Sequence, residues 1–179
     1  MMKVANFSND FPDIKLTEGV FFTDKRGSLK KVMYGDTLKN LIDPIIEVIV
    51  STSIKNVVRG LHFQNPPHEV SKLITCIRGE ILDCFLDIRS ESPTYGKYGT
   101  IRLNQNDRKA ILIPEGFAHG FSVLSEEATV VYLQSGNFSE EHDKVINPLS
   151  LNIDWKVKNH NLSDKDLNGV VFDEFRTLF

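Results

Sequence analysis

"KLITCIRGEILDCFLDIR" (residues 72–89) consists of two short apolar runs separated by Arg78 and Gly79. Each run has the length and the Ile, Leu, Phe and Cys content of a buried β-strand. Glycine accepts the positive φ that tight hairpin turns require. We therefore expect two antiparallel strands that fold back on each other and form a hairpin at Arg78-Gly79.

Similar runs recur along the chain, separated by turn residues. They are GVFFTD (19–24), IIEVIVSTS (45–53), VVRGLHF (57–63), AILIP (110–114), HGFSVLS (119–125) and ATVVYLQS (128–135). Helical signals are sparse: one short helix is expected at 35–43, and Ser163 is a candidate N-cap for a turn or helix near the C-terminus. This pattern predicts an all-β sandwich, jelly roll or barrel, a fold that commonly holds a ligand in its interior.

The composition is that of one globular domain covering residues 1–179. Hydrophobic residues make up 41%, charged residues 25%, and the net charge is -3, which argues against a nucleic-acid partner. The longest apolar stretch is too short to span a membrane, and the N-terminus has no apolar run of a signal peptide, so we expect a cytoplasmic protein. Cys76 and Cys84 lie in apolar runs and are expected to be buried thiols.

Asp83 lies inside an apolar run, where strand alternation places it on one face with Ile81 and Phe85. A carboxylate in such surroundings has to be paired, hydrogen-bonded or protonated. Other polar side chains on or beside expected strands are His62, Lys72, His119 and Tyr132. Each alone fits an ordinary structural role, but an antiparallel barrel would bring them together as a set able to abstract a proton, stabilise an oxyanion and return a proton.

A metal site is the alternative. Metal-ligand residue types are present at His62, His68, Glu69 and His119. Strand geometry favours a first pair of histidines two residues apart on one face, whereas His62 and His68 are separated by a Pro-Pro loop. We therefore favour acid/base chemistry and predict no metal.

Several motifs together resemble one family. They are VVRGLHFQ (57–64), residues 71–98, ILIPEGFAHGFSVLS (111–125), VVYLQS (130–135) and LSDKD (162–166). In this order they are similar to the dTDP-4-dehydrorhamnose 3,5-epimerases of the cupin superfamily. The resemblance implies a jelly-roll (cupin) homodimer that acts on a nucleotide-linked 4-keto-6-deoxy sugar without metal or organic cofactor.

The resemblance also implies catalytic roles. His62 would be the general base, with Asp166 fixing its tautomer. Lys72 would stabilise the enolate oxygen formed from the C4 ketone, and Tyr132 would deliver a proton to the opposite face of the ring.

Substrate-binding roles follow in the same way. Arg59 and His119 would bind the diphosphate or the sugar, and Arg26 would reach the nucleotide from the partner chain of a dimer with swapped N-terminal strands. Further candidate binding residues are Gln64, Asp83, Phe138 and Glu47. Residues 156–179 are expected to form a C-terminal extension.

Residues 57–64 pose a geometric problem. Strict alternation would put Arg59 and His62 on opposite faces of a strand, although both are expected in one pocket. We expect the strand to bend or bulge between them, and Gly60 is the residue that permits it.

Positions in three regions differ from the family pattern and leave the nucleotide open. Arg26-Gly27 is followed by SLKK (28–31), where the family usually has aromatic residues and then a glutamate. Glu47 and Ile49 stand where the family commonly has Gln and Asn, and Phe138 stands where it usually has Tyr. The default nucleotide is dTDP, with GDP, CDP or UDP as alternatives, and inversion at C3, C5 or both stays open. The alternative functions are a sugar-nucleotide 3,4-ketoisomerase and a non-catalytic or metal-binding cupin.

Overall fold

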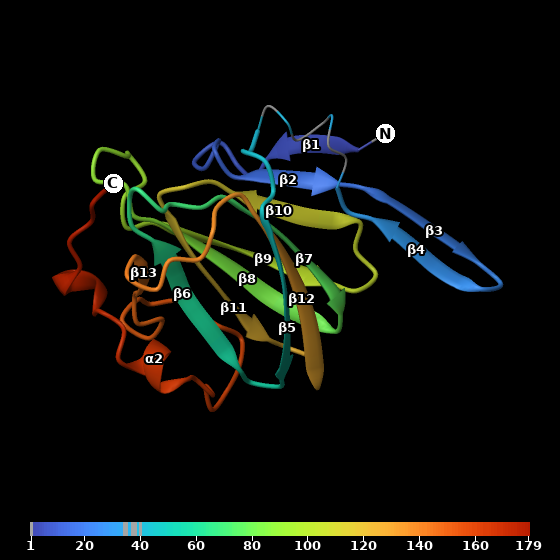
Figure 1. Ribbon diagram of the computed structural model, residues 1–179. Helices are drawn as coiled ribbons and strands as arrows, with labels where there is room; N and C mark the ends of the chain where they lie inside the picture. The colour runs from blue at the N-terminus through green and yellow to red at the C-terminus, as the bar shows by residue number, and fades with distance from the viewer. Residues whose placement is uncertain (1, 34–35, 37–38, 40) are drawn as a thin grey trace.

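The computed structural model describes residues 2–33, 36, 39 and 41–179. Two antiparallel sheets pack face to face (Figure 1). The strands are β1 (Lys3–Asn6), β2 (Lys15–Glu18), β3 (Val20–Asp24), β4 (Gly27–Lys31), β5 (Glu47–Ile54), β6 (Val58–Gln64), β7 (Lys72–Arg78), β8 (Glu80–Asp87), β9 (Tyr98–Asn104), β10 (Lys109–Ile113), β11 (Phe117–Val123), β12 (Glu127–Gln134) and β13 (Asp143–Val145). Helix α2 (Asp164–Leu167) and the 3₁₀ turn η1 (Phe172–Glu174) lie at the periphery. The predicted all-β jelly-roll class is confirmed.

The chain crosses between the sheets repeatedly. One sheet has the order β1-β2-β10-β7-β12-β5 and the other the order β13-β6-β11-β8-β9. The predicted hairpin at residues 72–89 is therefore wrong, because β7 and β8 belong to different sheets. The turn itself is where we expected it: Gly79 has φ +72, and a Cβ there would lie 2.0 Å from the Glu127 carbonyl oxygen. Alternation fixes which side chains point inward, but it does not fix which strand is the hydrogen-bonded neighbour.

The main core lies between the two sheets. Phe85 is central to it and makes edge-to-face contacts with Phe7 and Phe11 at centroid distances of 4.9 and 5.0 Å. Cys76 is buried in this core, and Cys84 is buried on the outer face of the five-stranded sheet, both as free thiols. Burial raises the pKa of the Cys76 thiol to about 11, as expected of a buried, unreactive cysteine.

The C-terminal segment covers the outer face of the five-stranded sheet. Trp155 and Phe175 pack there against Leu61. The Ser163 side chain accepts a hydrogen bond from the Asp166 N–H and caps helix α2, as predicted. This packing brings α2 against β6 and so delivers Asp166 to one wall of the interior.

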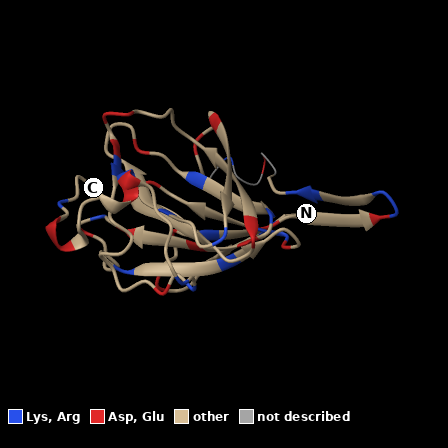
Figure 2. Cartoon of the chain, turned by 90° about the horizontal axis from the view of Figure 1, so that it is seen from below, with Lys and Arg blue, Asp and Glu red and all other residues tan. Residues whose placement is uncertain are grey.

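The β3–β4 hairpin extends away from the body of the molecule in both views (Figures 1 and 2). Its side chains include two exposed apolar residues, Phe22 and Leu29. The helix expected at 35–43 falls on a segment of which residues 34–35, 37–38 and 40 lie outside the described residues. Within the described part of the chain, no helix has the length and apolar character needed to cross a membrane.

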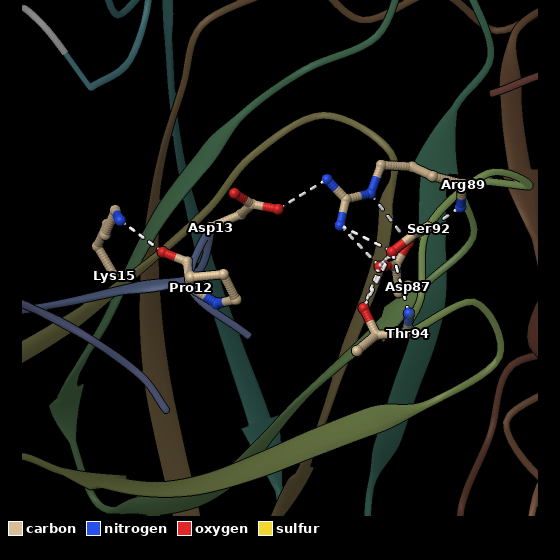
Figure 3. A network of polar contacts seen from close by, with 7 residues as sticks. All are labelled: Pro12, Asp13, Lys15, Asp87, Arg89, Ser92 and Thr94. Carbon is tan, nitrogen blue, oxygen red and sulfur yellow. Dashed lines mark hydrogen bonds and ion pairs between the residues drawn. The ribbon is translucent and has the colours of Figure 1, made fainter. Parts of the chain in front are cut away.

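A polar network closes the end of β8 (Figure 3). Asp87 is fully buried and accepts hydrogen bonds from the Arg89, Ser92 and Thr94 side chains at 2.6–3.0 Å. Arg89 also reaches Asp13, 2.9 Å away near β2. Burial alone would raise the pKa of Asp87, but these hydrogen bonds hold it below its usual value. The network ties the loop after β8 to the N-terminal segment.

Candidate active site

A cavity of about 260 Å³ opens between the two sheets. Its walls come from β5, β7 and β12 of one sheet and from β6 and β11 of the other. Most of the predicted site residues line it: Arg59, His62, Gln64, Lys72, His119, Tyr132 and Phe138. The fold therefore collects polar side chains that the sequence distributes over four strands and a loop.

The predicted bulge in β6 is confirmed. Two residues separate Arg59 from His62, whereas only Gly120 lies opposite them on β11. Gly60 has φ +112, and a Cβ there would lie 2.7 Å from the Gly120 Cα. The extra residue shifts the alternation of side chains by one position. Arg59 and His62 therefore both point into the cavity.

His62 and Asp166 form an ion-pairing contact, with 2.9 Å between His62 Nε2 and Asp166 Oδ1. Asp166 is buried while the imidazole remains partly exposed to the cavity. Burial alone would raise the pKa of Asp166, but the hydrogen bond from His62 and the imidazole charge hold it below its usual value. Asp166 therefore presents a carboxylate to the imidazole, in a position to orient it.

Lys72 extends from β7 into the same cavity. Its ammonium donates a hydrogen bond to the His62 carbonyl oxygen at 3.3 Å. Burial lowers the pKa of Lys72 to about 8, against the opposing charges of Asp143 and Asp83. Near neutral pH the group is thus a weakly solvated cation, well suited to stabilise negative charge.

Tyr132 lies on β12, in the opposite sheet from His62. Its ring packs edge-on against the His119 imidazole, with 5.7 Å between the ring centroids. Burial strongly raises the pKa of the phenol; the charge of Asp83 adds to this and that of Arg59 opposes it. The hydroxyl therefore stays protonated near neutral pH and can act as a proton donor.

His119 and Asp83 form a second, fully buried pair, with 2.8 Å between His119 Nε2 and Asp83 Oδ2. Asp83 was expected to need a partner in its apolar surroundings, and this pairing confirms that expectation. Burial raises the pKa of Asp83, opposed by the charges of His119 and Lys72. Asp83 is not among the residues that line the cavity; it holds His119 from behind.

Comparison with known proteins identifies the family of this chain. The family model of dTDP-4-dehydrorhamnose 3,5-epimerase matches residues 8–174. The chain belongs to this epimerase family. A 3,5-epimerase of Shigella flexneri is 39% identical over 168 residues, covering 91% of this chain and 93% of that protein. A dTDP-4-dehydrorhamnose 3-epimerase of Streptomyces niveus is 39% identical over 129 residues, covering 71% and 62%.

A solved structure is similar over nearly the whole length. The dTDP-6-deoxy-D-glucose-3,5-epimerase of Legionella pneumophila, in complex with dTDP-4-keto-L-rhamnose, has a TM-score of 0.91 and 30% identity, covering 98% of this chain and 95% of that chain. The predicted family resemblance is thereby confirmed. Members of this family are isomerases.

Several candidate binding residues of this epimerase-family chain lie around the cavity mouth. Gln64 bonds the loop that carries Phe138: its amide donates to the Asn137 carbonyl and accepts from the Ser139 N–H. The Arg59 Nε donates to the Ser53 hydroxyl at 2.8 Å, which holds the guanidinium over β5. The Phe138 ring is exposed at the edge of the cavity.

Besides Asp83, two further candidate binding residues do not line the cavity. Glu47 accepts a hydrogen bond from the Gln134 amide at 2.6 Å, and Gln134 is the residue of this pair that faces the cavity. Arg26 lies at the tip of the β3–β4 hairpin, where it pairs with Asp24. Within one chain, Arg26 is thus outside this site, and its expected role depends on a second chain.

The sequence reasoning missed Asp143. This residue opens β13, pairs in register with Gln64 and lines the cavity. Its sequence surroundings, EEHDK, give no strand signal and are typical of a solvated loop. Only the pairing of a three-residue edge strand with β6 directs it inward.

The histidines considered as a metal set are not gathered together. The His68 ring packs on His142 at a centroid distance of 4.4 Å instead of joining His62 and His119. Among residues 2–33, 36, 39 and 41–179, no three His, Cys, Asp or Glu side chains form a group that could hold a metal ion.

Proposed function

We propose that the protein is an epimerase of a dTDP-linked 4-keto-6-deoxyhexose that inverts C3, C5 or both by proton transfer across the cavity. One observation carries the proposal. His62, paired with Asp166, lies on one wall of the cavity, and Tyr132 lies on the facing sheet. Inversion at a carbon needs a base on one face of the ring and an acid on the other, and these two walls supply them.

The chemistry follows from the side chains. His62 takes the proton from a carbon next to the C4 ketone. The electron pair of the broken C–H bond forms a double bond to C4, and the π pair of the carbonyl moves to the ketone oxygen. The Lys72 ammonium stabilises the resulting enolate oxygen. Tyr132 then donates its proton to the carbon from the opposite face, and solvent restores the protonation states of both residues. The substrate neither gains nor loses electrons overall, so these proton-transfer steps require no redox cofactor.

Binding of the nucleotide part is assigned to residues around the mouth. The Arg59 guanidinium is a bidentate donor suited to diphosphate oxygens, and it lines the cavity beside His119. Phe138 offers an exposed ring for the sugar or the base, within a loop that Gln64 fixes. Glu47 would act through the Gln134 amide that it holds.

A homodimer is part of the proposal. The outer face of β5 presents Val48, Val50 and Ile54, each exposed by more than 60%. An exposed apolar row on a sheet face indicates an interaction surface. The projecting β3–β4 hairpin would then exchange between chains and bring Arg26 to the neighbour's cavity.

The test uses chelator-treated protein, dTDP-4-keto-6-deoxyglucose and deuterated water. Deuterium entry at C3 and C5, followed by proton NMR, is the expected result. Deuterium at one carbon alone would identify a single-site epimerase. Absence of exchange with the dTDP, GDP and CDP sugars would overturn the proposal, and a carbonyl that moves from C4 to C3 in the carbon spectrum would identify a ketoisomerase.

A further inference from the structure

Two serines lie on the inner side of strand β5. Alternation along β5 directs Ser51 and Ser53 toward the space between the sheets, whereas Thr52 and Ile54 point outward and are exposed. Ser53 is only 5% exposed. A buried hydroxyl in such a position has to be hydrogen-bonded, because its removal from water is otherwise unfavourable.

The partner of Ser53 comes from the opposite sheet. Arg59 on β6 lines the cavity and reaches β5, where its Nε–H donates a hydrogen bond to the Ser53 Oγ at 2.8 Å. The backbone fixes both residues: Ser53 pairs in register with Ala128 on β12, and the bulge at Gly60 turns Arg59 inward. The contact therefore depends on the same strand irregularity that shapes the site.

The place of this hydrogen bond on the guanidinium determines which donors stay free. Arginine carries N–H donors on Nε and on both terminal nitrogens. Ser53 takes the Nε–H, and Arg59 makes no other hydrogen bond among the residues that the structure describes. The terminal Nη1 and Nη2 groups thus remain free as a pair, and such paired donors match two oxygens of a phosphate group.

Ser53 is also a neutral partner. In the described part of the chain, no carboxylate forms an ion pair with Arg59. A hydroxyl fixes the guanidinium without neutralising it, whereas a carboxylate at the same place would fix it and cancel its charge. The positive charge of Arg59 therefore stays available for an anion in the cavity.

We propose that Ser53 is a positioning residue for the diphosphate of the substrate: it holds the Arg59 guanidinium with both terminal nitrogens free for the cavity and with its charge intact. The proposal rests on the diphosphate-binding role that the proposed function gives to Arg59. Ser53 is not among the residues that line the cavity, so it acts through Arg59 and not by contact with the substrate.

The test is isothermal titration calorimetry of the full-length protein with dTDP. Ser53→Ala should bind dTDP about tenfold more weakly, which is the effect of losing one hydrogen bond that orders a charged group. Ser53→Thr keeps the hydroxyl and should bind like the wild type. Ser53→Asp should bind more weakly than Ser53→Ala, because its carboxylate neutralises the guanidinium. The matched control is Thr52→Val, which removes a hydroxyl that contacts the Thr129 hydroxyl at 3.1 Å and should change nothing.

A double-mutant cycle separates positioning of Arg59 from general damage to the fold. In Arg59→Met, which lacks the guanidinium, Ser53→Ala should cause no further loss of dTDP affinity. In the epimerisation assay, Ser53→Ala should raise KM and leave kcat close to the wild-type value, as expected when substrate and transition state lose the same interaction. A merely structural defect would persist in the Arg59→Met background and would lower kcat.

Unchanged dTDP affinity in Ser53→Ala, or an equal loss in the Arg59→Met background, would overturn the proposal. Tighter binding by Ser53→Asp than by Ser53→Ala would also overturn it. If Ser53→Asp does not fold, Ser53→Ala and Ser53→Thr still decide the question.

This inference and the proposed function can fail separately. Weaker dTDP binding by Ser53→Ala, in a protein that does not epimerise the dTDP sugar, would leave the inference standing and refute the proposed function. Wild-type epimerisation with unchanged dTDP affinity and KM in Ser53→Ala would do the reverse. Failure of the wild-type protein to bind dTDP would overturn both.

Discussion

His62 on β6 and Tyr132 on β12 belong to different sheets, yet both line one cavity. The β6 bulge at Gly60 turns His62 inward, and the alternation of β12 does the same for Tyr132. A sugar ring bound between the sheets would have one of these side chains on each face. The proposed function depends on this relationship, because a base and an acid on the same wall would return the proton to the face from which it came.

Asp166→Asn should lower kcat by about 100-fold or more, since the amide cannot stabilise the protonated imidazole of His62. The measurement is steady-state epimerisation, with circular dichroism to establish folding. Asp164→Asn, on the exposed face of the same helix, is the matched control and should retain activity. Near-wild-type turnover in Asp166→Asn would show that the His62–Asp166 pair is not required for catalysis.

The activity of the wild-type protein should fall as the pH rises through about 8, the pKa to which burial lowers Lys72. The protonated ammonium is the form that stabilises the enolate, so activity is present below this pKa and lost above it. Lys72→Met should lose about 100-fold or more in kcat at every pH and should lack this alkaline limb. If Lys72→Met keeps the alkaline limb of the wild-type pH–activity profile, that limb reports the titration of another group.

Arg26→Ala and His62→Ala homodimers should each be inactive, whereas mixed dimers of the two should recover activity. In a mixed dimer, the chain with intact His62 would receive Arg26 from its partner, giving one complete site. Unfolding and refolding the two variants together, followed by an epimerisation assay, provides the measurement. A mixture no more active than the separate variants would argue against a swapped hairpin.

Asp87→Asn should destabilise the fold by about 3 kcal/mol, because Arg89 would keep its charge beside a neutral partner. Asp13→Asn, at the exposed end of the same network, should cost less than about 1 kcal/mol. The pKa of Asp87 is lowered in the folded state. Its stabilisation is therefore present above the ordinary carboxylate pKa and lost as the pH falls below it.

Urea unfolding of both variants at pH 7 and pH 3 would test this expectation. The difference between Asp87→Asn and the wild type should shrink at the lower pH, because pH 3 lies below the ordinary carboxylate pKa of the unfolded chain. A difference that stays constant would indicate that Asp87 contributes through packing alone.

The sequence was sufficient to predict most of the strands of the two sheets, because period-two alternation is a local property of the chain. It gave no prediction for β1, β2, β9 and β13. It also predicted that Arg59 and His62 need a bulge at Gly60 to share a pocket. It did not reveal strand pairing. The turn at Gly79 contains the glycine that is typical of a hairpin, but the strands on either side of it belong to different sheets. That choice is made by long-range packing, which a local pattern does not record.

Asp143 illustrates the same limit within the site. Its position in the cavity wall depends on an edge pairing with β6 and on an ion pair to a helix near the C-terminus. Motif residues such as His62 and Lys72 were found because the family pattern marks them. Asp143 lies in an acidic stretch, and no motif used in the sequence analysis includes it.

The most direct test of the account is solvent exchange in Tyr132→Phe. In deuterated water, His62 should still remove a proton and return a deuteron to the same face, so the recovered dTDP-4-keto-6-deoxyglucose should carry deuterium without inversion. His62→Ala should show neither exchange nor inversion. Normal inversion by Tyr132→Phe, or continued exchange in His62→Ala, would contradict proton transfer between these two walls.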